Sequence, residues 1–372
     1  MFRKTAPPSG APRREPANGI SVTDAGPCQK SVRLRLDPEA IQPVRAAVIS
    51  EFQKQATLAG FRKGKAPVHL VERQYAQAIQ EELLHRITKQ SLERAVTEHQ
   101  LRPVGPFEVH RADLTADGLQ LEATVEVEPL FELAQYKQIR LTRPSAEVTP
   151  QEMEQGMASV QDSMAQMEPA GEGQPKQRNV PPLDDELAKD LGFESLERLR
   201  THVGAKLREQ KRAAQAEALE DALCDELLKR HAMDVPPKLI AHQAQRLTQD
   251  FKARLLLAGI PEVQLEDEVK KFTEQLRDSA QRRVKLGFIL DRIAAQESIT
   301  VSEGEVVERL WQLARRWNKD PAEVRKMFDA RGLWPSVMTT IRQEKTIRRL
   351  LSEAAITDAV PASLAAPESA TR

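Results

Sequence analysis

The sequence predicts an α+β protein, with a small N-terminal α+β domain followed by an elongated, all-helical domain. Short runs of alternating apolar and polar residues occur near the N-terminus, whereas apolar residues spaced three and four apart dominate from residue 183 onward. Aromatic residues make up 4% of the chain and charged residues 30%, which is typical of solvated helices and not of an aromatic-lined β fold. The 372 residues suffice for two or three domains.

The α+β domain is expected over residues 30–143. Alternation in Ser-Val-Arg-Leu-Arg-Leu predicts a half-buried strand, and Asp37 with Pro38 then provides an N-cap and a first-turn proline. The expected elements are strands at 31–36, 107–110 and 119–127 and helices at 37–56 and 68–98. Residues 1–29 are predicted to be a disordered leader, Pro- and Arg-rich at its start and without the apolar segment of a secretion signal.

Residues 144–180 have a different character and predict a helical arm with a linker. Thr149, Pro150 and Glu152 combine an N-cap, a first-turn proline and an acidic third position, which together open a helix. Glycines and prolines follow this helix until residue 182. The segment is too short to form a domain of its own.

The remaining ordered residues, 181–358, are predicted to be helical, with a disordered tail at 359–372. A helix over residues 194–230 would be about 55 Å long at 1.5 Å per residue. Ser302 with Glu305, and Asp320 with Pro321, mark two further helix starts. Narrow apolar stripes on long helices favour an arm-like domain that exposes apolar grooves.

No residue pattern indicates a metal, a cofactor or a catalytic nucleophile. Cys28 and Cys224 are too far apart for a metal or redox pair, and the seven histidines lack ligand spacing. We therefore expect no metal and no cofactor, and acidic pairs such as Asp184 with Asp185 are interpreted as solvated charges. The three tryptophans, at 311, 317 and 334, are interpreted as packing anchors between the terminal helices.

Charge and hydropathy exclude several classes of protein. The 55 basic residues balance the 55 acidic ones, so the chain is not a globally basic nucleic-acid coat and no DNA partner is expected. The longest uncharged apolar stretch, residues 255–260, is far shorter than the ~20 residues that span a bilayer. We expect a cytoplasmic protein without a membrane partner.

The stretch Gly60-Phe61-Arg62-Lys63-Gly64-Lys65-Ala66-Pro67 is the most informative in the chain. It is not a phosphate-binding P-loop, because the glycine spacing is one residue short and no Ser or Thr follows Lys65. Two glycines and a proline instead shape a tight loop between two helices, with three cations around one aromatic residue. An apolar anchor among cations fits a surface that mixes protein with phosphate backbone, although a flexible charged loop would share the composition.

This octapeptide resembles the ribosome-docking signature G-F-R-x-G-K-x-P of the bacterial trigger factor family at every specified position. Val180–Ala188, Arg282–Gly287 and Asp320–Arg325 are similar to stretches of that family's helical chaperone domain. The resemblance covers roughly residues 30–143 and 180–358. It implies an ATP-independent chaperone that docks at the ribosomal tunnel exit and shields apolar segments of nascent polypeptides.

The resemblance also implies which residues act. Gly60, Gly64 and Pro67 would hold the loop, while Phe61, Arg62, Lys63 and Lys65 would contact the large ribosomal subunit through protein and rRNA. Flexible methionines on the helices are candidate client contacts, with core filling as the alternative reading. The candidates are Met153, Met157, Met164, Met327 and Met338.

One departure from the family is expected. Relatives usually carry an FKBP-like prolyl isomerase domain between the two regions, but residues 144–179 leave only 36 positions where such a domain needs on the order of 100. We infer that this domain is absent and that the chain is not an isomerase. The alternatives are a prolyl isomerase acting on unfolded chains and a holdase that works without the ribosome, and homodimerisation of the free protein is left open.

Overall fold

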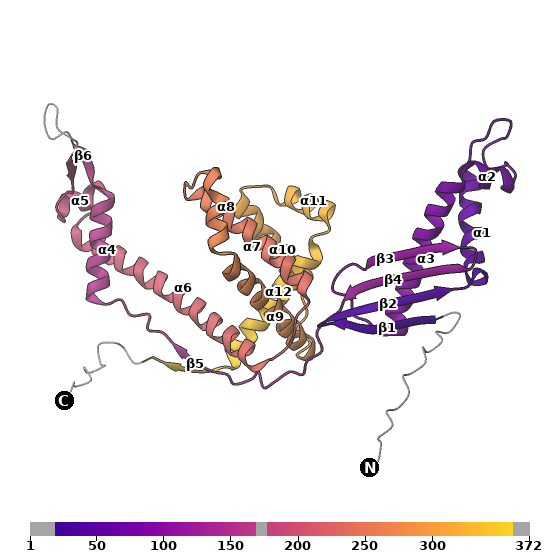
Figure 1. Ribbon diagram of the computed structural model, residues 1–372. Helices are drawn as coiled ribbons and strands as arrows, with labels where there is room; N and C mark the ends of the chain where they lie inside the picture. The colour runs from indigo at the N-terminus through magenta and orange to yellow at the C-terminus, as the bar shows by residue number, and fades with distance from the viewer. Residues whose placement is uncertain (1–18, 169–176, 360–372) are drawn as a thin grey trace, which may run out of the picture. The chain divides into compact units, whose positions relative to one another are not determined.

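The computed structural model describes residues 19–168 and 177–359 (Figure 1). Its contacts divide the chain into two compact units, each assembled from two separate stretches. The first unit combines Met1–Glu132 with Ala232–Phe288, and the second combines Leu133–His231 with Ile289–Arg372. The α+β class with a long helical remainder is confirmed.

A four-stranded antiparallel sheet with the order β1-β2-β4-β3 forms the centre of the first unit. Its strands are β1 (Gly19–Gly26), β2 (Gln29–Leu36), β3 (Glu108–Thr115) and β4 (Gly118–Glu126). The prediction of a disordered leader over residues 1–29 is wrong for β1, which pairs with β2 so that Val22 lies opposite Val32. Ile20 and Val22 pack against the core, so burial fixes this edge strand. The part of the predicted leader at 1–18 lies outside the described residues.

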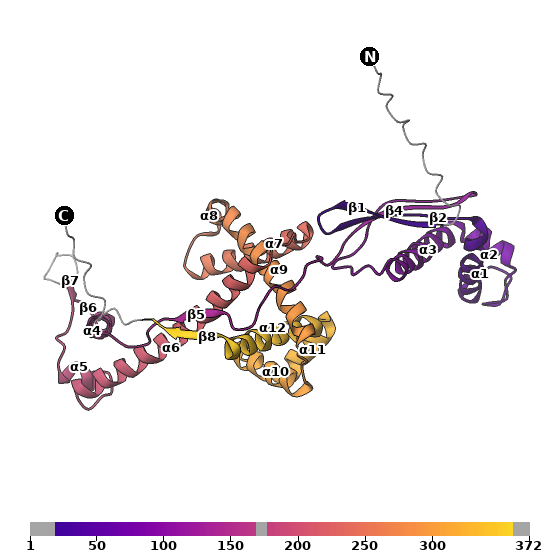
Figure 2. The same cartoon turned by 90° about the horizontal axis from the view of Figure 1, so that it is seen from below.

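Two long helices lie against one face of this sheet and a short one packs against those two helices, while the opposite face is open (Figure 2). They are α1 (Pro38–Gln55), α2 (Val68–Gln74) and α3 (Ala76–Glu98). Val48, Val71 and Ile87 from the helices meet Val32 and Leu121 from the sheet in one buried core. The single helix predicted over 68–98 is interrupted at Tyr75, whose ring packs against Phe52 with 6.1 Å between ring centroids.

Helices from much later in the chain belong to the same unit. They are α7 (Pro237–Leu257), α8 (Glu262–Lys271) and the first part of α9 (Thr273–Gln296). Glu126, which is 4% exposed, accepts hydrogen bonds from the backbone N–H of Lys238 at 2.7 Å and of Leu239 at 3.3 Å. The carboxylate thus satisfies two N–H groups that the first turn of a helix leaves unpaired. This bond ties α7 to the sheet, so the compact units do not follow the domain limits predicted at residues 143 and 181.

The second unit contains the predicted helical arm. Its elements are α4 (Pro150–Ser163), α5 (Asp185–Asp190), α6 (Leu196–Arg230) and the short antiparallel pair β6 (Gln166–Glu168) and β7 (Gln177–Asn179). The capping box of Thr149 and Glu152 forms as the sequence predicts. α4 packs on α6 around Leu199 and Val203, and Gly204 leaves room there for the Met153 side chain.

The rest of the second unit is helical except at its end. It comprises α10 (Glu303–Trp317), α11 (Pro321–Arg331), α12 (Trp334–Glu353) and β8 (Ala355–Asp358). The helix starts at Ser302 and Asp320 form as predicted. An all-helical region is wrong for β8, which pairs in parallel with β5 (Arg140–Arg143). Within the ranges 19–168 and 177–359, no helix has the length and apolar character needed to cross a bilayer.

Candidate docking surfaces

The Gly60–Pro67 loop joins α1 to α2 at one end of the first unit. Gly60 and Gly64 have φ angles of +86° and +78°, a left-handed conformation that glycine adopts without strain. Phe61 N–H donates to the Leu58 carbonyl at 3.1 Å, and Lys65 N–H donates to the Arg62 carbonyl at 2.9 Å. The two glycines therefore form two consecutive tight turns, and Pro67 then starts α2 as its N-cap.

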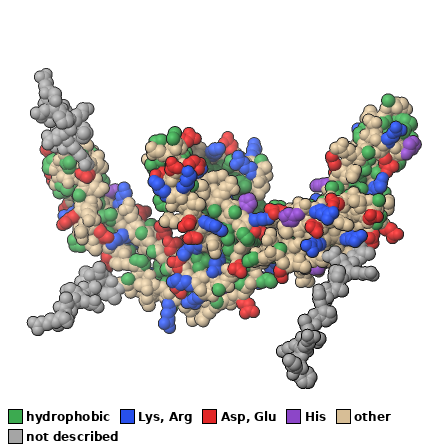
Figure 3. All heavy atoms as spheres, in the orientation of Figure 1, with side chains coloured by type: hydrophobic (Ala, Val, Ile, Leu, Met, Phe, Trp, Pro, Cys, Tyr) green, Lys and Arg blue, Asp and Glu red, His purple; other side chains and the backbone are tan. Residues whose placement is uncertain are grey.

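The loop exposes one aromatic ring among cations, as the sequence predicts for a docking element. Phe61 is 41% exposed. Arg62, Lys63 and Lys65 are exposed, and none of them forms an ion pair with a described residue. Hydrophobic and basic side chains lie side by side at this end of the unit (Figure 3). Charges that are not paired with described residues remain available to an anionic surface.

The base of the loop is held firmly while its tip is free. Ala66 is buried, and the Gln53 side-chain amide donates to its carbonyl at 2.7 Å. Arg86 on α3 binds both carboxylate oxygens of Glu51 on α1, at 2.9 and 2.8 Å, and also Glu82. These hydrogen bonds lower the pKa of Glu51 and raise that of Arg86. A rigid base reduces the ordering that docking requires.

Val68 is a contact candidate that sequence reasoning missed. It is the first residue of α2, directly after the loop, and its side chain is exposed, so a partner that reaches this end of α2 could contact it. A β-branched residue in the first turn of a helix normally reads as part of the core stripe. The one sequence signal for its exposure is that it directly follows the two glycine turns of the loop.

The methionines predicted to contact clients fall into two groups. Met157 is 6% exposed in the α4–α6 core, and Met153 packs in the same cluster. Met327 packs beside Phe328, and Met164 is half-buried at the end of α4. Met153, Met157 and Met327 therefore fill cores, because the packing partner of each helix decides which face is covered. Met338 is exposed and therefore stays a candidate client contact.

Met338 lines a groove of about 400 Å³ between α10, α11 and α12. Val306, Val307, Leu310 and Trp334 form its apolar part, with Glu303 and Arg325 at the rim. Val307 is exposed, and Trp311, one helical turn further along α10, is 51% exposed. Trp311 is therefore not the packing anchor that the sequence suggested, and α10 exposes apolar side chains beyond those that line the groove.

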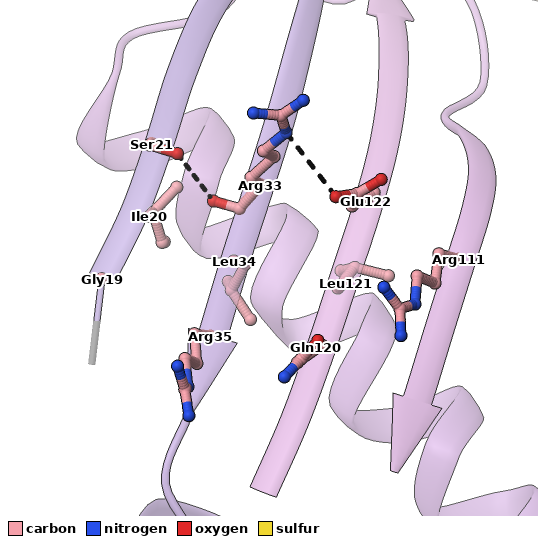
Figure 4. Close-up of a pocket in the computed structure, with 10 residues that line it drawn as sticks. All are labelled: Gly19, Ile20, Ser21, Arg33, Leu34, Arg35, Arg111, Gln120, Leu121 and Glu122. Carbon is pink, nitrogen blue, oxygen red and sulfur yellow. Dashed lines mark hydrogen bonds and ion pairs between the residues drawn. The ribbon is translucent and has the colours of Figure 1, made fainter. Parts of the chain in front are cut away.

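Two further hollows lie on the first unit. One, between α3 and the edge strand β3, is lined mainly by apolar side chains such as Leu84, Phe107 and Val109. The other lies on the open face of the sheet, where Arg33 is 3.6 Å from Glu122 and Ser21 donates to the Arg33 carbonyl (Figure 4). This hollow is lined more by polar than by apolar surface, and Arg33 and Glu122 partly neutralise each other, so it is a weaker candidate for binding an unfolded chain than the apolar hollow beside α3.

The described residues contain no group of three or more His, Cys, Asp or Glu side chains that could hold a metal. Cys28 donates through Sγ to the Asp234 carbonyl at 3.3 Å. Burial, with further contributions from Asp234 and Glu126, raises the pKa of this thiol and so disfavours the reactive thiolate. We assign Cys28 a structural contact and no chemistry.

Comparison with known proteins gives a consistent result. The family model described as bacterial trigger factor protein (TF) matches residues 19–160, and the model of the bacterial trigger factor C-terminus matches residues 195–352. A trigger factor of Anaeromyxobacter dehalogenans (strain 2CP-C) is 25% identical over 91% of this chain and 99% of its own length. A trigger factor of Pelobacter propionicus is 22% identical over 93% and 99%.

A solved structure has the same fold. It comes from work on promiscuous substrate recognition in the folding and assembly activities of the trigger factor chaperone. It superposes with a TM-score of 0.52 at 16% identity, over 90% of this chain and 99% of that one. At this identity the likeness shows the fold alone.

The comparison also bears on the interval between the two matched regions. The alignment with the Anaeromyxobacter protein runs over 426 residues, more than the 372 of this chain. That relative therefore has a long segment with no counterpart here. Only residues 161–194 separate the regions that the two family models match, and their described part contains the β6–β7 pair and α5. An FKBP-like domain does not fit into this interval.

Proposed function

Because the chain belongs to the trigger factor family, we propose that it is a ribosome-associated chaperone that docks near the tunnel exit through the Gly60–Pro67 loop. One observation carries the proposal. The loop exposes Phe61 beside three cations that have no ion-pair partner among the described residues. In a loop with only a structural role we would expect the aromatic ring to pack against the core. An exposed ring is expected in a loop that binds a partner.

In this proposal Phe61 enters an apolar hollow on a ribosomal protein, and Val68 widens the contact. Arg62, Lys63 and Lys65 pair with acidic side chains or with rRNA phosphates. Aromatic anchors supply much of the affinity of a small interface, while charge pairs steer its association. Attachment at the tunnel exit would place the protein in the cytoplasm.

Nascent chains would bind apolar surfaces such as the groove lined by Met338, Val307 and Trp334. A thioether and an indole adapt to varied apolar side chains, so a single surface accepts many sequences. Release needs no nucleotide in this scheme, because the dissociation rate and burial of the client's own core set the lifetime of the complex.

Co-sedimentation with purified 70S ribosomes tests the docking step. We expect the wild-type protein to pellet with ribosomes and Phe61→Ala/Arg62→Ala/Lys63→Ala to stay in the supernatant, with affinity at least about tenfold lower. Lys89→Ala/Arg94→Ala, on exposed positions of α3 in the same unit, is the matched control and should pellet like wild type. Circular dichroism must show that both variants remain folded.

The salt dependence of binding distinguishes contacts of the cations with phosphates from the apolar contact of Phe61. If the cations pair with phosphates, binding should weaken steeply with ionic strength, and Arg62→Ala/Lys63→Ala should flatten that dependence. Phe61→Ala should weaken binding without changing the slope. A wild-type protein that never pellets would refute docking and leave a holdase that acts free of the ribosome.

A further inference from the structure

A second cationic surface lies on α10 and α11, far from the docking loop in sequence. Its six basic residues are all exposed, and none forms an ion pair with a described residue. They are Arg315, Arg316, Lys319, Arg325, Lys326 and Arg331. By contrast, Arg309 on α10 binds Glu344, and Lys345 on α12 binds Glu305. We call these six residues the α10–α11 basic surface.

Local stabilisation explains only part of this charge. Arg315 and Arg316 lie in the last turn of α10 and Arg331 in the last turn of α11, where cations offset the helix dipole. Arg325 and Lys326, in the middle of α11, have no such role. Two of the three carboxylates in the same segment are already engaged, since Asp320 caps α11 and Asp329 accepts a hydrogen bond from Trp334 Nε1 at 2.6 Å. With six basic and three acidic residues, the segment 315–331 carries a net positive charge in a chain whose net charge is zero.

An exposed aromatic residue, Trp317, lies in the same segment, directly after Arg315 and Arg316 and two positions before Lys319. Trp317 stacks on Phe328 with 6.1 Å between ring centroids and an interplanar angle of 29°. Trp317 is nevertheless 42% exposed, so the ring is supported from beneath and partly open to solvent. A ring fixed by a stacked neighbour is a preformed platform for another flat group.

We propose that the α10–α11 basic surface binds single-stranded RNA, with phosphates on the cations and one base stacked on Trp317. An acidic peptide would neutralise the cations but would leave the tryptophan without a regular partner. Each nucleotide supplies both a phosphate and a flat base, which matches the combination of side chains here. The surface lies entirely within the second unit and is independent of the Gly60–Pro67 loop and of the proposed docking there.

Fluorescence anisotropy with a labelled single-stranded RNA of about 20 nucleotides, titrated with the full chain at several salt concentrations, tests the proposal. We expect Arg315→Gln/Arg316→Gln/Lys319→Gln to weaken binding at least about tenfold and to reduce the slope of log affinity against log salt by about 2. Trp317→Leu should weaken binding roughly tenfold with an unchanged slope. All substituted side chains are exposed, and circular dichroism verifies the fold.

Matched controls distinguish binding at the α10–α11 basic surface from nonspecific binding of RNA to any exposed cations. Arg198→Gln/Arg200→Gln/Lys206→Gln removes two arginines and a lysine from exposed positions of α6 and should bind like wild type. Arg62→Gln/Lys63→Gln/Lys65→Gln tests the docking loop and should also retain binding. The proposal is overturned if the α10–α11 triple variant binds no worse than the α6 triple variant, or if the loop variant alone abolishes binding. Equal displacement by polyglutamate, together with full affinity of Trp317→Leu, would instead show a site for acidic polypeptides.

Discussion

At the scale of single residues, Glu305 shows how one carboxylate can connect two helices. It lies 2.7 Å from Lys345 Nζ on α12, and it also accepts hydrogen bonds from Ser302 N–H and Oγ at 2.8 and 2.9 Å. Lys345 first, and then the Ser302 backbone, lowers the pKa of Glu305 to about 2. The capping box at the start of α10 is therefore also a bridge to α12.

This lowered pKa predicts how acid affects stability. A carboxyl with a depressed pKa stabilises the fold above its unfolded-state pKa, near 4.3, and the stabilisation disappears as the pH falls toward 2. Glu305→Gln should therefore melt at a lower temperature than wild type above pH 5, and the difference should vanish near pH 2. Thermal unfolding followed by circular dichroism from pH 7 to 2 measures this. Glu217→Gln, on an exposed position of α6, is the control, and a Glu305→Gln difference that persists unchanged at pH 2 would contradict the assignment.

What could be predicted at this scale was local in the chain. The capping boxes at Thr149 and Ser302 follow from residues three positions apart, and the turns at Gly60 and Gly64 follow from glycine itself. The burial of Met157 could not be predicted this way, because α6 supplies the surface that covers it. The same reason explains Trp311, which is exposed because the neighbours of α10 pack against another face.

At the scale of elements, the buried carboxylate of Glu126 caps α7 from a different element, strand β4. Residues 126 and 238 are 112 positions apart, so no local sequence motif predicts this cap. The N-terminal residue of the helix is Pro237 after Pro236, and neither offers a capping side chain. The sheet thus supplies what the local sequence lacks.

Removing this cap should destabilise the first unit. Glu126→Ala leaves the N–H groups of Lys238 and Leu239 without their acceptor, which should lower the free energy of unfolding by about 2 kcal/mol. Glu128→Ala, on the exposed side chain two residues further on, should change it by less than about 0.5 kcal/mol. Urea denaturation measures the difference, and hydrogen exchange should accelerate at the amides of 238 and 239 in Glu126→Ala alone. Equal exchange in both variants would show that the cap is not needed.

Several of the elements that sequence analysis missed are defined by distant partners. β1 was not predicted because its residues follow a Pro- and Arg-rich start. Its pairing with β2 is what makes it a strand. β5 and β8 have four residues each, too few for periodicity to be recognised. The longer elements, with several apolar residues on one face, were predictable without any tertiary information.

At the scale of the whole molecule, the chain passes between its two units at residues 132–133, 231–232 and 288–289. Sequence analysis divided the chain into consecutive domains, because composition changes along the chain are the only boundaries that it can detect. Contacts such as those between Glu126 and α7 join two stretches of the chain that sequence composition assigns to different domains.

The domain composition of the whole chain predicts whether the protein can catalyse prolyl isomerisation. The interval between the two family regions is too short for a domain with its own pocket, so we expect no acceleration of cis–trans exchange in a protease-coupled peptide assay. Uncatalysed exchange takes tens to hundreds of seconds at 25 °C, which leaves a wide window for detecting catalysis. A rate that rises in proportion to protein concentration would overturn this prediction, and a mock purification from cells that lack the protein controls for contaminating isomerase.

The parallel pairing of β5 with β8 has a consequence for biosynthesis. Synthesis proceeds from the N-terminus, so residues 140–143 emerge about two hundred residues before their partners at 355–358. Throughout that interval β5 is a strand without its hydrogen-bonded neighbour, open to pairing with the wrong chain. During its own synthesis this chain therefore exposes an unpaired strand edge, and under the proposed function another copy bound to the ribosome would be the first chaperone to meet it.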